Sequence, residues 1–297
     1  MSFDRTQPPL VFGEALFDCF PDGAEVLGGA PFNVALHLQA FGARPVFISR
    51  IGNDELGARI EQAMTSRGMT TLALQHDPSH DTGTVQVKLA DGEPSYEIVT
   101  DVAYDHIDAV ALPPMPSGGL LYHGSLALRQ SDSADALRTL RGRLDPAVFI
   151  DVNLRDPWWN KAQLQHLIEG ASWVKLNADE LELLAPGGDD VESRATQLCD
   201  RYGLKAVFAT LGARGAVAVS GNGEIDRVAP GAQVEVVDAV GAGDGFAAML
   251  IIGLLRGWAV ADTLERAQAF ASAIVGRRGA TVDAPAFYAP FIDQWGL

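Results

Sequence analysis

The stretch from Val234 to Leu255, VEVVDAVGAGDGFAAMLIIGLL, constrains this chain more than any other. It opens with β-branched residues in a run short enough for a buried strand. The apolar run Phe246–Leu255 is long enough for a buried helix and too short to span a bilayer. A helix N-terminus offers unpaired N–H groups and a positive dipole end to an anion. The glycine turn therefore predicts an anion cradle beside the carboxylate of Asp244, which suits phosphoryl transfer onto a hydroxyl.

Asp244 also has a simpler interpretation as a helix cap, because Asp is favoured there. Two better-known nucleotide motifs do not fit this stretch. No G-x-x-x-x-G-K-[ST] occurs, and the third glycine of G-x-G-x-x-G would fall at Phe246. A second glycine motif, GGAPFN, lies about two hundred residues upstream. Pro31 suits the first turn of a helix, and Asn33 is then either a cap or a small-molecule contact.

The composition limits the class of protein. The chain has 297 residues, of which 47% are hydrophobic, and this fits one large α/β domain or a domain with an accessory piece. The net charge of −16 argues against nucleic acid or an anionic membrane surface as a partner. The start carries no signal-peptide pattern, so we expect a cytoplasmic protein. Cys19 and Cys199 form no metal pattern, and Pro78 between His76 and His80 favours loop residues over metal ligands.

From Leu120 onward, predicted strands alternate with predicted helices. This rhythm implies a mainly parallel sheet covered on both faces. Asn153, Arg155, Asn177 and Glu180 come directly after predicted strands, where such sheets bind ligands. Asn177 and Glu180 are also spaced as a capping pair, so that interpretation stays open.

The block from about residue 72 to residue 100 breaks that rhythm. Asp91-Gly92 is a strong hairpin signal. The flanking strands alternate polar and apolar residues, so one face should be wet and the other covered, with a second subunit as one candidate for the cover. We expect a small β-sheet set apart from the main layers, with strands at Leu72–Gln75, Thr84–Leu89 and Ser95–Val99.

The first apolar run, Leu10–Phe20, predicts a strand that Gly13 interrupts. Glu14 and Asp18 are carboxylates within this run. Carboxylates are seldom buried without a partner. Either both face water on an edge strand, or one of them lines a polar ligand site.

Taken together, GGAPFNVALHLQAFGARPVFISRIGNDELG and DAVGAGDGF resemble the two signatures of the pfkB, or ribokinase-like, sugar kinases. The resemblance runs from about Leu10 to Asp283. The stretches GEALFD, YHGSLAL, DVNLR and VKLNADEL look most like bacterial fructokinases. The resemblance implies a three-layer α/β/α ribokinase-like fold with a mainly parallel central sheet. It also implies a single kinase domain over 1–297, with a β-lid from about 14–28 and 72–100 that makes a homodimer contact.

The same resemblance implies ATP, a sugar, Mg²⁺ and a monovalent cation such as K⁺ as ligands. Asp244 corresponds to the catalytic base, and the N–H groups of Gly241, Ala242, Gly243 and Asp244 correspond to the anion hole. The implied substrate positions are Asp18, Gly28, Gly29, Asn33 and Arg155. The implied nucleotide positions are Lys175, Asn177, Thr210, Gly212 and Gly243. Mg²⁺ is implied through water at Asn177 and Glu180, and K⁺ at Asp238, Val240, Ile274, Arg277 and Gly279.

This chain departs from the family pattern at a few positions. Ala239 and Val240 replace common threonines, Gly245 replaces a common alanine and should loosen the helix start, and Phe32 should narrow the sugar pocket. The sequence predicts ATP-dependent phosphorylation of a primary sugar hydroxyl, with D-fructose favoured. The alternatives are 2-keto-3-deoxygluconate, whose carboxylate Arg155 could bind, and ribose or a nucleoside. A sugar-binding regulator without catalysis is the rival from another class.

Overall fold

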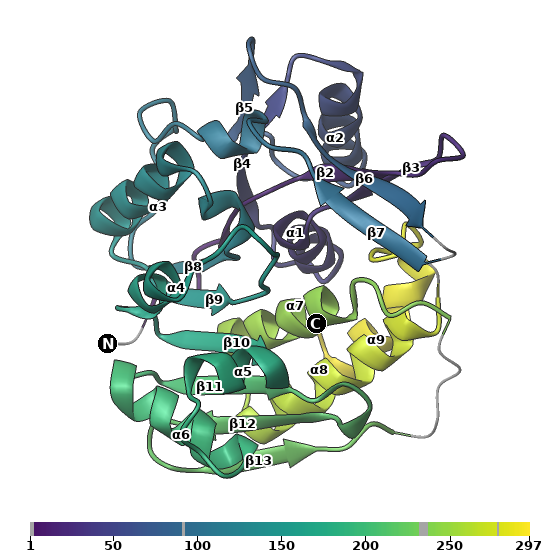
Figure 1. Cartoon of the computed structure of the whole chain (residues 1–297). Coiled ribbons are helices and arrows are strands. Elements are labelled where there is room, and N and C mark those ends of the chain that lie inside the picture. Colours follow the sequence, from purple (N-terminus) through teal and green to yellow (C-terminus); the bar gives the residue numbers. More distant parts are fainter. Residues whose placement is uncertain (1–2, 91–92, 232–236, 278) are drawn as a thin grey trace.

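The computed structural model describes residues 3–90, 93–231, 237–277 and 279–297 (Figure 1). Its centre is a nine-stranded sheet. In spatial order the strands are β13 (Ile225–Val228), β12 (Ala216–Ser220), β11 (Ala206–Thr210), β10 (Trp173–Asn177), β9 (Ala147–Asp151), β8 (Leu120–His123), β1 (Leu10–Phe12), β4 (Val46–Gly52) and β5 (Leu74–Asp77). Neighbouring strands are parallel from β11 to β5, and β12 and β13 are antiparallel to their neighbours.

Helices cover both faces of this sheet, so its central strands are buried on both sides. Val11 packs into one core cluster, whereas its neighbours Leu10 and Phe12 pack into another on the opposite face. On the Val11 face lie α1 (Ala30–Ala40), α2 (Glu55–Ser66), α7 (Ala242–Arg256), α8 (Val260–Val275) and α9 (Pro285–Trp295). On the other face lie α3 (Ser131–Leu144), α4 (Lys161–Ile168), α5 (Ala178–Leu184) and α6 (Val191–Tyr202).

The predicted apolar helix is α7, and its position in the core explains its apolar composition. It packs against both α1 and α8, so residues 245–253 are all buried. A helix that is apolar all round belongs in a core of this kind. Within the described residues, no helix combines the length and the apolarity needed to cross a bilayer.

A second sheet of four strands lies apart from strands β8 to β13 (Figure 1). Its order is β3 (Glu25–Gly28), β2 (Leu16–Cys19), β6 (Gly83–Ala90) and β7 (Glu93–Ile98). Val85 and Val87 are buried, whereas Gln86 and Lys88 are exposed, as the alternation predicted. Tyr96 and Val26 are exposed on this sheet, with 62% and 44% of their surface accessible.

The structure differs from the sequence predictions at three places. The strand expected at Leu72–Gln75 is β5, and it pairs in parallel with β4 in the large sheet instead of joining the small one. The hairpin turn at 91–92 and the predicted strand residues up to Val236 lie outside the described residues. Val237 is described but lies in no strand, and 52% of its surface is exposed. Helix α7 begins at Ala242, two residues before Asp244.

The strand order indicates where along the edge of the large sheet a ligand is expected to bind. β1 lies between β8 and β4, and the chain continues on one side through β4 and β5 and on the other through β8 to β13. Parallel sheets bind ligands beyond the carboxyl ends of their strands, at the point where the strand order reverses. That point here is between β1 and β8.

Candidate active site

Asp244 lies at this edge, in the first turn of α7. Its Oδ2 accepts a hydrogen bond of 2.8 Å from Nδ2 of Asn33 on α1, 211 positions earlier in the chain. The Asp244 side chain makes no capping bond, because the N-cap is Gly241. Asn33 is likewise no cap, since Gly29 holds that position on α1. Both simple capping interpretations are therefore wrong, and the two glycine motifs meet through this one bond.

The electrostatic surroundings make Asp244 a weak acid for an aspartate. Burial raises the pKa of Asp244 to about 6, against the lowering effect of the Asn33 hydrogen bond and of the Lys175 charge. A carboxylate whose pKa lies near neutral pH is suited to accept a proton. The same carboxylate remains mostly ionised at pH 7.

The turn before Asp244 is built on a glycine at the N-cap of α7. Gly241 has φ +80°, and a Cβ there would lie 2.2 Å from Cα of Ala280. Only glycine fits both that conformation and that contact. The Ala242 N–H donates to the Ala239 carbonyl oxygen at a long 3.4 Å. The N–H groups of Gly243 and Asp244 have no hydrogen bond within the described residues, so they are available to an anion. Gly245 was expected to loosen the helix start, but a Cβ there would lie 2.1 Å from Cδ1 of Ile274, so glycine is what the packing of α8 permits.

Lys175 brings a positive charge to this turn. Its Nζ lies 3.3 Å from the position that a Cβ on Gly243 would take. The same Nζ donates to Asp151 at 3.0 and 2.8 Å, and both side chains are buried. Burial alone would lower the pKa of Lys175, but the Asp151 carboxylate outweighs it and the pKa is raised. The lysine therefore stays charged beside the N-terminus of α7.

The predicted substrate positions gather around the start of the small sheet. A Cβ on Gly28 would lie 3.5 Å from Oδ2 of Asp18, so the carboxylate lies over the glycine backbone. Gly29 has φ +103°, and a Cβ there would lie 2.6 Å from the Glu14 carbonyl oxygen. Oδ1 of Asn33 is buried without a partner in the described structure. An unpaired buried amide oxygen is costly, so this atom is available to a ligand hydroxyl.

Arg155 serves this region electrostatically. Its Nη1 donates to the carbonyl oxygen of Leu154 at 2.9 Å, and its side chain is exposed. Burial raises the pKa of Asp18, and the Arg155 charge opposes that rise. The same charge lowers the pKa of Asp244 and of Glu14. The Arg155 charge therefore acts on three carboxylates of the site at once.

Asn177 and Glu180 form a complete capping box at the start of α5. Oδ1 of Asn177 accepts from the Glu180 N–H at 2.9 Å, and Oε2 of Glu180 accepts from the Asn177 N–H at 2.8 Å. Oε1 of Glu180 also accepts from the Leu154 N–H at 2.8 Å. The capping interpretation is confirmed, and it fixes the Glu180 carboxylate between the ends of β9 and β10. Each of its oxygens keeps a lone pair beyond those bonds.

The remaining predicted positions fall into two groups. Thr210 ends β11 directly opposite Asn177 in the parallel register, and Gly212 follows it with φ +58° in an exposed turn. Asp238 accepts from the N–H groups of Val240 and Gly279 at 3.0 and 3.1 Å, which joins the segments before α7 and after α8. The Ile274 carbonyl oxygen accepts from the Arg277 N–H at 2.9 Å. The structure therefore brings Asp238, Val240 and Gly279 together.

Two carboxylates that the sequence did not assign also belong to this site. Glu14 is buried, its Oε2 has no partner in the described structure, and burial raises its pKa to about 7. Asp151 pairs with Lys175, and its charge raises the pKa of Asp244. Both positions carried a signal, since Glu14 follows a strand and Asp151 opens the DVNLR stretch at the end of another.

Comparison with known proteins gives consistent matches. The sequence profile described as pfkB family carbohydrate kinase matches residues 20–286. Escherichia coli fructokinase is 32% identical over 258 residues, which cover 82% of this chain and 83% of that protein. Aminoimidazole riboside kinase of Salmonella typhimurium is 30% identical over 294 residues, which cover 93% of this chain and 91% of that protein. The structure of Vibrio cholerae fructokinase with fructose, ADP and calcium has a TM-score of 0.83 at 26% identity, covering 96% of this chain and 99% of that chain.

Proposed function

The chain belongs to the pfkB family of carbohydrate kinases, and from this premise we propose that it transfers the γ-phosphoryl group of ATP to a primary hydroxyl of D-fructose. The observation that carries the proposal is Asp244, held by Asn33 beside the first turn of α7. A carboxylate there accepts the hydroxyl proton as the oxygen attacks phosphorus. The N–H groups of Gly241 to Asp244 and the ammonium of Lys175 then stabilise negative charge on the transferring group.

Mg²⁺ fits this chemistry through Asn177 and Glu180. The Glu180 carboxylate is fixed by two backbone N–H groups and still has free lone pairs, so it suits a hydrated ion better than direct coordination. When bound, Mg²⁺ would neutralise charge on the phosphates. Lys175 within β10, Thr210 at the end of β11 and Gly212 just beyond it would contact the nucleotide.

A neutral ketose suits the substrate side better than an acid sugar. The charge of Arg155 would favour a sugar carboxylate if it were free. That charge already acts on Asp18, Glu14 and Asp244, so the carboxylates outnumber Arg155 even when Glu14 is protonated. An anionic substrate would therefore meet net repulsion from these groups.

We expect D-fructose to give a higher kcat/KM than 2-keto-3-deoxygluconate, ribose or adenosine. Aminoimidazole riboside belongs in the same assay, because the riboside kinase matches 93% of this chain. Release of ADP, coupled to a dehydrogenase reaction, measures all five compounds with one enzyme preparation. A preference for the acid sugar that disappears in Arg155→Ala would replace fructose by that substrate. ADP release with none of the five would favour the silent sugar-binding regulator.

We expect Asp18→Ala to weaken sugar binding while leaving ATP binding nearly unchanged. Loss of a partly buried hydrogen-bonding carboxylate costs ~1–3 kcal/mol, or roughly five- to a hundred-fold in Kd. Asp22→Ala is the matched control, because Asp22 lies in the turn after the same strand and bonds only to the Ala24 N–H among the contacts described. Calorimetric titration with sugar and with an ATP analogue separates the two sites. Equal sugar affinity in Asp18→Ala and the control would remove Asp18 from the pocket.

We also expect K⁺ to raise activity above that in tetramethylammonium at equal ionic strength. Asp238 binds the N–H groups of both Val240 and Gly279, so an ion held there would order the turn before α7. Val240, which is exposed, would supply only its backbone carbonyl oxygen to the ion. The absence of the threonine common at this position is therefore no obstacle. Equal initial rates in the two chloride salts would contradict a functional cation site.

For the small sheet we propose a homodimer contact in the cytoplasm, supported by its exposed Tyr96 and Val26.

A further inference from the structure

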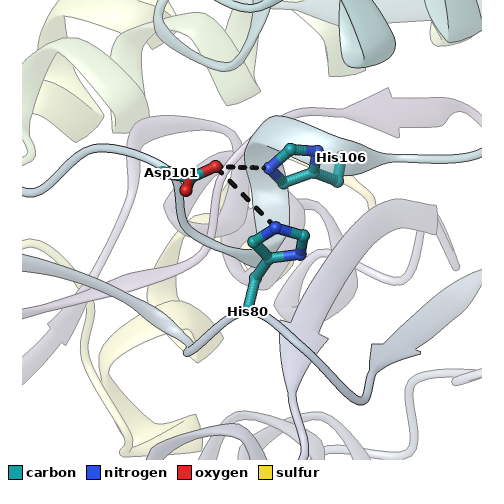
Figure 2. Close-up of side chains that lie close together, drawn as sticks. All are labelled: His80, Asp101 and His106. Atoms are coloured by element: carbon teal, nitrogen blue, oxygen red, sulfur yellow. Dashed lines mark hydrogen bonds and ion pairs between the residues drawn. The ribbon is translucent and has the colours of Figure 1, made fainter.

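Three side chains outside the proposed active site converge where the small sheet joins the main fold (Figure 2). His80 lies between β5 and β6, just before the small sheet's hairpin begins. Asp101 lies between β7 and the short helix η1 (Ala103–His106), and His106 ends that helix. The three residues therefore come from both ends of the β6–β7 hairpin.

The converging atoms are one carboxylate oxygen and two ring nitrogens. Nε2 of His106 lies 2.9 Å from Oδ1 of Asp101, and Nε2 of His80 lies 3.7 Å from the same oxygen. All three ligand atoms lie within 4.8 Å of one another. Ligand bonds of ~2.0–2.1 Å in a tetrahedral zinc site place ligand atoms roughly 3.3 Å apart. The observed separations fall on both sides of that value.

A second carboxylate fixes each ring from behind. Nδ1 of His80 lies 3.0 Å from Oδ2 of Asp77, and Nδ1 of His106 lies 2.9 Å from Oδ2 of Asp132. Asp77 is itself held by Arg50 at 2.7 Å and by the N–H groups of Ser79 and His80. Histidine ligands of metal ions usually donate their other N–H to a carboxylate, which fixes the tautomer and raises ligand basicity. Both rings here are set with Nδ1 occupied and Nε2 toward the shared space.

The position of Asp101 adds an independent observation. Asp101 has φ +57°, a left-handed conformation that is uncommon for residues other than glycine. The neighbouring backbone bond from the Ala103 N–H to the Asp81 carbonyl oxygen, at 2.8 Å, already joins the two hairpin ends. That conformation places the Asp101 carboxylate opposite both imidazoles, although its side chain is largely exposed and remains reachable from solvent.

We propose that His80, Asp101 and His106 bind one Zn²⁺ ion, with water completing the coordination, and that the ion fastens the base of the β6–β7 hairpin to the main fold. Two imidazoles and a carboxylate are a donor set that zinc accepts readily. The rings now stack at 3.8 Å with 17° between their planes, whereas a shared ion must lie near both planes. Binding therefore turns the two rings apart, each about its Nδ1–carboxylate contact. His80 lies in a loop, as the sequence predicted, and the proposal departs from that prediction only in giving it a role as a metal ligand.

The test is equilibrium binding to the full chain, stripped of metal with EDTA and then titrated in excess Mg²⁺. We expect one Zn²⁺ per chain in the wild type and at least tenfold weaker binding in His80→Gln and in His106→Gln. His76→Gln is the matched control, because exposed His76 lies on β5 near His80 and has only Glu61 close to it among the ion pairs described. Co²⁺ in place of Zn²⁺ reports the coordination number by its visible absorption.

Proton competition provides a second readout. Metal binding needs a neutral imidazole, so the affinity for Zn²⁺ should fall at acid pH, where protons compete for the ring nitrogens. Burial lowers the pKa of His106, but the hydrogen bonds to Asp132 and Asp101 outweigh burial and raise it, so protons compete more strongly at this ring. Asp77 and Arg50 complete the charged surroundings of His80.

Amide hydrogen exchange links the ion to the hairpin. Zn²⁺ should slow exchange in residues 78–82 and 99–106 of the wild type and leave the His80→Gln/His106→Gln double variant unchanged. Thermal unfolding without metal shows whether each variant is folded. If a folded double variant binds Zn²⁺ as tightly as the wild type, or if the wild type binds none, the cluster is a histidine–carboxylate charge network and the proposal is wrong. Failure of sugar phosphorylation would leave this result unaffected, since the cluster shares no residue with the active site.

Discussion

Replacing Asp244 by asparagine should lower kcat by ~10²–10⁴-fold while leaving the affinities for sugar and nucleotide close to those of the wild type. The amide keeps the shape of the side chain and can still accept the hydrogen bond from Nδ2 of Asn33. What it loses is the ability to take a proton from the attacking hydroxyl. Steady-state kinetics with calorimetric binding separates these effects. A variant with wild-type kcat would show that the base lies elsewhere.

The pH dependence of kcat/KM should also report the protonation of Asp244. With the pKa of Asp244 raised to about 6, kcat/KM should fall as pH drops through about 6, because the base becomes protonated. Glu14 titrates at about 7 in the same site and could produce a similar fall. Glu14→Gln distinguishes the two. If the fall near pH 6 persists in Glu14→Gln, Asp244 is responsible, and if it disappears, the titrating group is Glu14.

Asp244→Asn should also be more stable than the wild type, by an amount that depends on pH. The folded state holds the Asp244 proton up to about pH 6, whereas the unfolded chain loses it near 3.8. The folded state therefore binds more protons between these values, and stability falls as pH rises through that window. Above pH 6 the full cost is present, about 1–3 kcal/mol once solvent screening is allowed for. Denaturant unfolding of Asp244→Asn should show this gain at pH 7.5 and none at pH 4.

The sequence predicted the fold because its strongest signals are local. Alternating strands and helices and the two glycine motifs required a mainly parallel sheet with helices on both faces, and the ribokinase-like fold and the kinase family are confirmed. The predicted apolar helix over Phe246–Leu255 lies within α7 (Ala242–Arg256). The error at Leu72–Gln75 concerned the strand's pairing partner, because a short strand pattern does not say which sheet the strand joins. β5 joins the large sheet through its parallel register with β4.

The site was predictable only where a residue lay within a motif. Asp244 and Asn33 were identified that way, but their hydrogen bond joins residues 211 positions apart and no local pattern contains it. Glu14 was left between two interpretations because its burial depends on α1, which brings Gly29 against the Glu14 backbone. Asp151 was missed for a related reason. Its role rests on Lys175, which is its register partner in the neighbouring strand β10 but lies 24 positions later in the chain.

Asp151→Asn should destabilise the fold by ~3–5 kcal/mol, the range for breaking one side of a buried ion pair. Lys175 is 7% exposed and donates twice to Asp151, so the variant leaves a buried ammonium without its counter-charge. Only the charges of Asp244 and Glu180 then oppose the effect of burial on the lysine, so its pKa should fall. Urea unfolding at pH 7 measures the loss. Asp105→Asn is the matched control, because Asp105 forms an equally buried pair with Arg129 at 2.7 Å.

Lys175→Met in the Asp151→Asn background separates stability from function. Methionine removes the unpaired cation and fills similar space, so most of the lost stability should return. Activity should not return, because Lys175 lies beside Gly243 at the start of α7, where charge on the transferring phosphoryl group would develop. Removing one such donor costs ~10²–10³ in kcat. Asp105→Asn should lose stability with a far smaller change in kcat. If instead the double variant recovers both stability and turnover, the Lys175–Asp151 pair serves only the core, and the anion site consists of the backbone N–H groups of α7 alone.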